Sequence, residues 1–141
     1  MNTSRAWSAE YSIETSASAE AIWSLFRDVG AWASWNAGIE SIALEGPFAA
    51  GTSFTMKPPG QDAMRSRLTE VRENECFVDE TTVDDLTIRV AHRIERKGKG
   101  KGARVTYTVS AEGPGAEEIG PAVASDFPDV LAALARKAEA R

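Results

Sequence analysis

Three polar side chains, Asp79, His92 and Tyr107, have residue types and spacings that would let them act together on a ligand. A two-residue turn at Asp84-Asp85 would set Asp79 diagonally beside His92 on neighbouring strands. Carrying the same register across the next turn sets His92 beside Tyr107. A histidine on an apolar face titrates near neutrality, and a carboxylate beside it favours its charged form. The spacing therefore predicts a polar cluster, unless a slip in register turns Asp79 toward solvent.

This polar cluster has two possible chemical roles and one structural role. Its groups could anchor the hydroxyl or carbonyl of a ligand. They could instead transfer protons, and the candidate catalytic residues are then His92, Asp79 and Tyr107. The structural alternative is that the three groups satisfy one another's hydrogen bonds inside a filled core.

The other residues predicted to bind ligand are mostly large and apolar. They come from the strands on either side of the turn, from an earlier strand and from two helical segments. Each apolar member has ordinary core packing as its alternative role. The full set of predicted ligand-binding residues is Trp32, Trp35, Phe54, Met56, Phe77, Asp79, Thr81, Ile88, Val90, His92, Tyr107, Phe127 and Leu131.

Hydrophobic periodicity indicates which elements position these residues. Short links rich in Gly, Pro, Asn and Asp join most of the predicted strands, so these strands form hairpins in an antiparallel sheet. Two short helices are predicted after the first strand. The first is capped by Ser16 or Ser18 and ends at Gly30, and the second covers 31–36. Alternation with a period of two predicts seven strands, at 7–15, 39–45, 52–57, 65–72, 76–83, 86–95 and 103–111.

A long amphipathic segment closes the chain. Its apolar stripe runs at helical spacing from Ile119 to Ala138, and Pro128 predicts a kink or a restart at Ser125. Only the sheet is large enough to bury this stripe. A sheet curved over one helix leaves room between them, and that room is where we expect the ligand.

The order of the elements and several local motifs resemble the helix-grip fold of the SRPBCC superfamily, which includes START and birch-pollen-allergen proteins. More narrowly, the chain resembles the bacterial polyketide cyclase/dehydrase-like proteins. Ser18 stands where that family often has proline, and Pro128 interrupts the closing helix. The motifs that carry the resemblance lie at 17–23 (ASAEAIW), 29–36 (VGAWASWN), 51–54 (GTSF), 68–71 (LTEV) and 102–107 (GARVTY).

The resemblance implies one α+β helix-grip domain over residues 1–141, with a seven-stranded antiparallel sheet curved around a long C-terminal helix. It also implies that a small hydrophobic ligand, such as a lipid or an aromatic polyketide, binds in an internal cavity between the sheet and that helix. Two alternatives stay open: a polyketide cyclase or dehydratase that uses acid and base groups of the cavity, and a protein-interaction domain like the chaperone co-activators. Because the family has no shared catalytic motif, the resemblance leaves enzyme activity undecided.

Composition argues against several other functions. The chain has 141 residues, 43% hydrophobic and 26% charged, as is typical of one globular domain. Its net charge of −5 argues against nucleic-acid binding. One cysteine and one histidine cannot form an ordinary metal site, and we expect neither a metal nor a cofactor. No apolar run suggests a signal peptide or a membrane span, so we expect a cytoplasmic protein, as a monomer or a homodimer.

Overall fold

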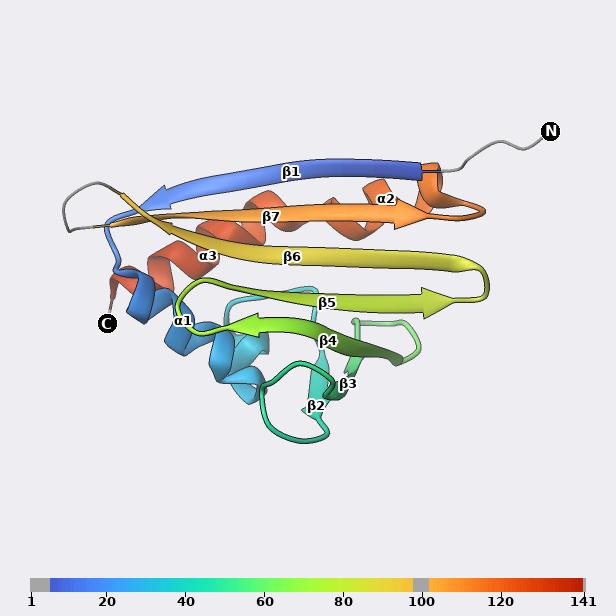
Figure 1. The fold of residues 1–141 in the computed structure, drawn as a ribbon, viewed down its shortest axis with the longest axis horizontal. Helices are drawn as coiled ribbons and strands as arrows, with labels where there is room; N and C mark the ends of the chain where they lie inside the picture. Colours follow the sequence, from blue (N-terminus) through green and yellow to red (C-terminus); the bar gives the residue numbers. More distant parts are fainter. Residues whose placement is uncertain (1–5, 98–101, 141) are drawn as a thin grey trace.

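The computed structural model describes residues 6–97 and 102–140, which form a seven-stranded antiparallel sheet with helices against one face (Figure 1). We call this the inner face. Residues 98–101, in the predicted turn between the last two strands, lie outside the described residues. The elements are β1 (Ala6–Thr15), α1 (Ala19–Arg27), the 3₁₀ helix η1 (Val29–Ser34), β2 (Ser41–Leu44), β3 (Ser53–Lys57), β4 (Met64–Arg72), β5 (Cys76–Val83), β6 (Leu86–Arg96), β7 (Ala103–Glu112), α2 (Ala116–Ala124) and α3 (Phe127–Glu139).

The strand register predicted around the Asp84-Asp85 turn is confirmed. The strands lie in the order β1-β7-β6-β5-β4-β3-β2. Asp79 pairs with Val90, and His92 lies between Phe77 on β5 and Tyr107 on β7. Because side chains alternate along each strand, Asp79, His92 and Tyr107 all lie on the same face of β5, β6 and β7.

The first helices follow from a cap and an apolar stripe. The hydroxyl of Ser18 accepts a hydrogen bond from the backbone N–H of Ala21 at 3.0 Å and so caps α1. Ile22 and Phe26, one turn apart, are completely buried. The chain then continues into η1, whose Trp32 is buried, with Trp35 at its C-terminal end. Both tryptophans are thereby brought to the inner face of the sheet.

The closing segment is two helices. The predicted restart occurs at Ser125 and Asp126, between α2 and α3. Pro128 lies in the first turn of α3, where its missing N–H costs no helical hydrogen bond. The predicted stripe is wrong at Ile119, which is 42% exposed. The reason is that α2 packs closely on the sheet through the small residues Ala116, Gly120 and Ala124.

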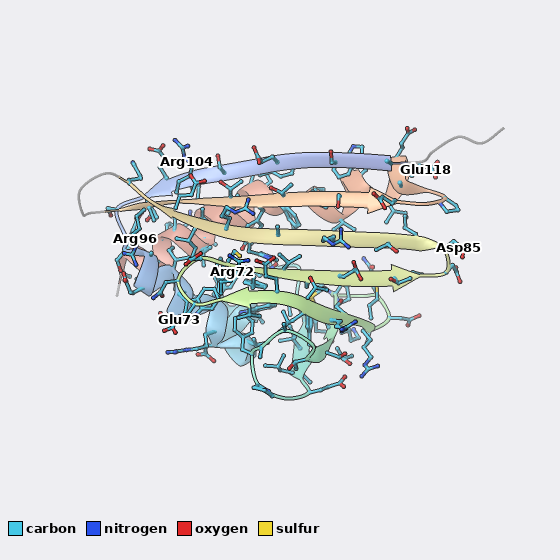
Figure 2. The ribbon with its side chains drawn as sticks, in the orientation of Figure 1. Arg72, Glu73, Asp85, Arg96, Arg104 and Glu118 are labelled. Carbon is cyan, nitrogen blue, oxygen red and sulfur yellow. The ribbon has the colours of Figure 1, made fainter. Side chains whose placement is uncertain are left out.

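The outer face of the sheet carries charged and polar side chains (Figure 2). The predicted pair of Glu80 and Arg89 forms an ion pair, and Arg104 lies 2.7 Å from Glu14. Such exposed pairs contribute little to stability, but they are typical of a solvated surface. Within the described part of the chain, no helix has the length and apolar character needed to cross a membrane.

The close approach of α2 to β1 gives a test of the fold. A Cβ atom at Gly120 would overlap the indole ring of Trp7. We expect Gly120→Ala to lower the free energy of unfolding by about 1–3 kcal/mol in urea denaturation. Gly30 is the matched control, because a Cβ atom there would meet nothing within 4 Å. Equal losses in the two alanine variants would contradict this packing.

Candidate functional site

Asp79, His92 and Tyr107 come together on the inner face, as the sequence predicted. They lie on the adjacent strands β5, β6 and β7. His92 Nε2 is 3.9 Å from Asp79 Oδ2, and the rings of His92 and Tyr107 meet edge to face with centroids 4.5 Å apart. We call these three residues the polar cluster.

Aromatic rings fix the orientation of His92. Phe77 stacks on the imidazole with ring centroids 3.9 Å apart, and Phe26 of α1 packs against it at 5.9 Å. His92 Nδ1 is 3.2 Å from the carbonyl oxygen of Phe77. Because a carbonyl oxygen only accepts hydrogen bonds, we assign the proton of the neutral ring to Nδ1. Nε2 is then an acceptor that faces Asp79.

Burial disfavours the charged form of each member of the polar cluster. It lowers the pKa of His92 to about 3, an effect only partly opposed by the hydrogen bond to Phe77. It raises the pKa of Asp79 to about 7. It also raises the pKa of Tyr107, with a further contribution from the negative charges of Asp79 and Asp126. At pH 7 the imidazole and the phenol are therefore neutral, and the carboxyl group of Asp79 is close to half protonated.

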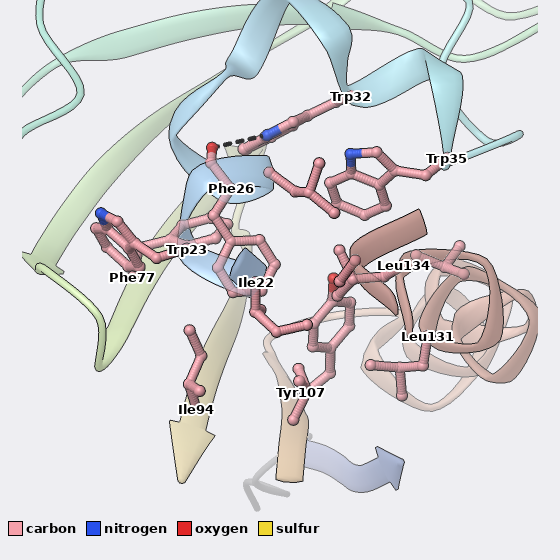
Figure 3. Close-up of a cluster of buried hydrophobic side chains, with 14 of the residues drawn as sticks. Ile22, Trp23, Phe26, Trp32, Trp35, Phe77, Ile94, Tyr107, Leu131 and Leu134 are labelled. Carbon is pink, nitrogen blue, oxygen red and sulfur yellow. Dashed lines mark hydrogen bonds between the residues drawn. The ribbon is translucent and has the colours of Figure 1, made fainter. Parts of the chain in front are cut away.

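One half of the inner face is sealed by helices. Figure 3 shows Ile22 and Phe26 of α1 with Leu131 and Leu134 of α3, packed over strand residues that include Ile94 and Tyr107. We call this the sealed half. Its fully buried side chains include Phe26, Phe77, Ile22, Leu131, Leu134 and Val105.

The other half of the inner face is only half-buried. Met56, Thr81 and Ile88 point to the inner face by strand register, and each is partly exposed. Phe127 at the start of α3 is also partly exposed and meets Tyr107 edge to face, with ring centroids 5.4 Å apart. We call these four residues the open half. The polar cluster lies where the open half joins the sealed half, because Asp79 and Thr81 are successive inward residues of β5.

The predicted ligand-binding residues divide between these regions. Met56, Thr81, Ile88 and Phe127 form the open half, and Val90 lies in a small cluster with Ala124 of α2. The remaining apolar members, Trp32, Trp35, Phe54, Phe77 and Leu131, are buried in the main core.

Sequence reasoning missed two residues beside the polar cluster. Phe26 was identified only as part of a helical stripe, yet its ring contacts His92, Phe77 and Tyr107. Asp126 carried no signal in the sequence, because its position depends on how the helix restarts. Its charge acts on Tyr107 from the start of α3.

Ile22 and Phe26 fill the part of the inner face under α1, where the sequence predicted part of an internal cavity. Two open depressions stand out elsewhere in the described chain. One, of about 290 Å³, is lined by residues that include Trp23, Phe48 and Val71. The other, of about 440 Å³, is lined mostly by polar residues at the ends of β1 and α3. Neither is lined by a residue that was predicted to bind ligand.

The comparisons with known proteins identify the family. Residues 6–139 match the family described as "Polyketide cyclase / dehydrase and lipid transport". The chain belongs to this family. No curated protein matches the chain significantly.

Solved structures show the same fold at low sequence identity. The Zhui aromatase/cyclase from Streptomyces sp. R1128 superposes with a TM-score of 0.81 at 13% identity, over 96% of this chain and 94% of that one. A norcoclaurine synthase from Thalictrum flavum gives 0.77 at 13% identity, over 98% and 97%. A START superfamily protein from Mycobacterium smegmatis gives 0.74 at 17% identity, over 94% and 97%. The helix-grip fold predicted from the sequence is confirmed.

The raised pKa of Asp79 predicts how stability depends on pH. The folded chain holds this proton more tightly than the unfolded chain, so burial of Asp79 costs nothing below about pH 4. The cost grows as the pH rises to about 7. We expect Asp79→Asn to match the wild type at pH 4 and to exceed its free energy of unfolding at pH 8 by up to about 4 kcal/mol. Urea denaturation at several pH values measures this difference.

His92→Gln is the matched control, because its effect on the free energy of unfolding changes with pH in the opposite direction to that of Asp79→Asn. The pKa of His92 is lowered on folding, so its stabilising contribution is complete above about pH 6.5 and is lost as the pH falls toward 3. The glutamine variant should therefore gain stability relative to the wild type below about pH 6. Parallel pH profiles for the wild type and both variants would contradict the buried, neutral polar cluster.

Proposed function

We propose that this protein binds a small, mostly apolar molecule on the open half of the inner face, with a polar end of the molecule at the polar cluster. Family membership supports binding of this general kind. The observation that carries the proposal is that half-buried apolar side chains border three neighbouring polar ones, of which His92 and Tyr107 are buried and Asp79 is half-buried. Ligand sites combine these same features, an apolar surface and a few convergent polar groups.

The polar cluster has hydrogen-bonding capacity that it does not use internally. The 3.9 Å between His92 Nε2 and Asp79 Oδ2 is too long for a hydrogen bond. No hydrogen bond joins the side chain of Asp79 or the hydroxyl of Tyr107 to another group in residues 6–97 and 102–140. These oxygens are not among the fully enclosed polar atoms that lack a partner, so they keep some contact with solvent. A ligand hydroxyl or carbonyl at the polar cluster would take the place of that water.

Electrostatics favour an uncharged polar end on the ligand. Asp79 and Asp126 are the charged groups that act on Tyr107, and both carry negative charge when ionised. An anionic ligand would be repelled by them in a region of low dielectric constant. A neutral hydroxyl or ketone pays no such cost. We therefore expect alcohols, phenols or ketones with a hydrophobic body, rather than free fatty acids.

Proton-transfer catalysis is the second candidate function, and the pKa of Asp79 favours it. A carboxyl group with a pKa of about 7 can both accept and donate a proton near neutral pH. Two of the similar structures are named as a synthase and an aromatase/cyclase.

Deuterium exchange tests this second function with a simple ketone. If Asp79 acts as a base on a bound ketone, the protein should accelerate exchange at C2 of 1-tetralone in heavy water, measured by mass spectrometry. Asp79→Asn should abolish the acceleration. Exchange at the buffer rate with wild-type protein, under conditions where 1-tetralone binds, would contradict catalysis and leave binding as the function.

Adjacent threonines on β5 offer a matched test of where the ligand binds. Thr81 points into the open half and Thr82 is exposed on the opposite face. We expect Thr81→Trp to weaken binding of the uncharged fluorescent probe N-phenyl-1-naphthylamine at least tenfold, because the indole occupies the site. Thr82→Trp should bind like the wild type. Equal affinities in the two variants, both verified as folded by circular dichroism, would contradict the proposed location.

The natural ligand can be sought directly. Native mass spectrometry of freshly purified protein should show an added mass at a stoichiometry of one, and denaturing extraction should release a neutral, largely apolar molecule. Thr81→Trp prepared in the same way should lack that mass. A mass that is retained equally by the variant would place the bound molecule outside the open half.

A further inference from the structure

The smaller of the two open depressions has an apolar wall and room for a small molecule. It measures about 290 Å³, close to the lower end of the roughly 300–1,000 Å³ range of small-molecule sites. Trp23 of α1 and Phe48, in the connection between β2 and β3, line it with ring centroids 5.6 Å apart. Val71 of β4 adds to this apolar wall, and the side chains of Ala49 and Ala50 are too short to fill the space.

Trp23 brings an unpaired hydrogen-bond donor to this depression. The residue is only 4% exposed, and its Nε1 takes part in no hydrogen bond within residues 6–97 and 102–140. The nitrogen is not among the fully enclosed polar atoms that lack a partner, so it keeps some contact with solvent. In Figure 3 it lies at the outer edge of the cluster, turned away from Phe26. Because Trp23 lines the depression, a molecule bound there can reach its N–H.

The other two tryptophans of the aromatic core do not offer a donor in this way. Nε1 of Trp32 donates to the carbonyl oxygen of Phe26 at 2.8 Å. Nε1 of Trp35 also lacks a partner among the described residues, but the core encloses it completely. An indole N–H donates and cannot accept, so the accessible nitrogen of Trp23 requires an acceptor atom on any molecule that pairs with it.

Arg27 adds a positive charge beside this donor. It lies four residues after Trp23 on α1, so the two side chains project from the same side of the helix, one turn apart. The guanidinium of Arg27 is exposed, lines the depression and forms no ion pair in the part of the chain that the structure describes. A carboxylate suits this arrangement, because it accepts charge-assisted hydrogen bonds from a guanidinium and a further bond from an N–H.

Glu73 limits the charge that the depression accepts. It lines the depression from the turn between β4 and β5, and its side chain is exposed. An ionised carboxylate accepts hydrogen bonds but cannot donate them, and it repels a second negative group. A ligand with a single carboxylate and a hydroxyl or amino group elsewhere on its ring is therefore compatible with both Arg27 and Glu73.

We propose that this depression is a second binding site, for a small aromatic acid with one carboxylate and a ring hydroxyl or amino group. The carboxylate binds Arg27 and the Nε1–H of Trp23, and the aromatic ring packs on Phe48 and Val71. The site is separate from the open half of the inner face, where negative charges disfavour anions. Binding here is therefore independent of the function proposed for the open half.

A matched pair of arginines tests the proposal. We expect wild-type protein to bind 6-hydroxy-2-naphthoate with a stoichiometry of one, measured by isothermal titration calorimetry. Arg27→Gln should bind it about tenfold more weakly, because a charge-assisted hydrogen bond is lost. Arg136→Gln should bind it like the wild type. Arg136 is also an exposed arginine in the last turn of a helix, but it lies outside the depression.

A spectroscopic readout locates the carboxylate at Trp23. In ¹⁵N-labelled protein the indole signal of Trp23, assigned by its loss in Trp23→Phe, should move downfield with 6-hydroxy-2-naphthoate. It should move much less with 2-naphthol, which has the same ring and hydroxyl but no carboxylate. Thr81→Trp, which fills the open half, should leave the response to the naphthoate unchanged.

The results that would overturn the second site leave the function proposed for the open half standing. They are no binding of 6-hydroxy-2-naphthoate by the wild type at millimolar concentration, equal affinities in Arg27→Gln and Arg136→Gln, or a Trp23 signal that does not respond to the bound naphthoate. Loss of naphthoate binding in folded Thr81→Trp would also overturn it, because the acid would then occupy the open half.

Discussion

The continuous pairing of β5, β6 and β7 is the constraint on which the site depends. Because side chains alternate along each strand, a single register decides that Asp79, His92 and Tyr107 all face the helices. A slip of one residue would send all three to the charged outer face and bring Glu80 and Arg89 inward. The tight Asp84-Asp85 turn fixes that register, so a local feature of the chain determines the polarity of the interior.

Burial then sets the chemistry of these three residues. The helices exclude water from one side of the polar cluster, and the resulting low dielectric constant disfavours charge on every member. Folding raises the pKa of Asp79 and lowers that of His92. Between about pH 4 and pH 6.5 the pair therefore binds one proton in both states: it lies on His92 in the unfolded chain and on Asp79 in the folded chain. An uncharged polar group inside an apolar wall can recognise a neutral ligand without the cost of burying a charge.

The fold and the strand faces could be predicted from the sequence because they depend on local patterns. Period-two alternation, turn residues and the Ser18 cap each act within a few residues of chain. The match to a known family agrees with the fold that these local patterns predicted.

The division of the inner face could not be predicted in this way. It depends on where Phe26 inserts, on the restart at Asp126, and on a bulge in β4 after Leu68 that brings Val71 opposite Phe77. Packing between elements distant in sequence decides all three. The unpaired nitrogen of Trp35 is likewise invisible in the sequence, since Trp32 has the same residue type and burial but finds an acceptor.

Methyl NMR tests the central claim, that the open half holds the ligand, most directly. In protein labelled at methionine and isoleucine methyl groups, titration with N-phenyl-1-naphthylamine should shift the signals of Met56 and Ile88 saturably. The signals of Ile22 and Ile94, in the sealed half, should change much less. Saturable shifts confined to residues outside the open half, or no saturable shift at any methyl group, would contradict the account.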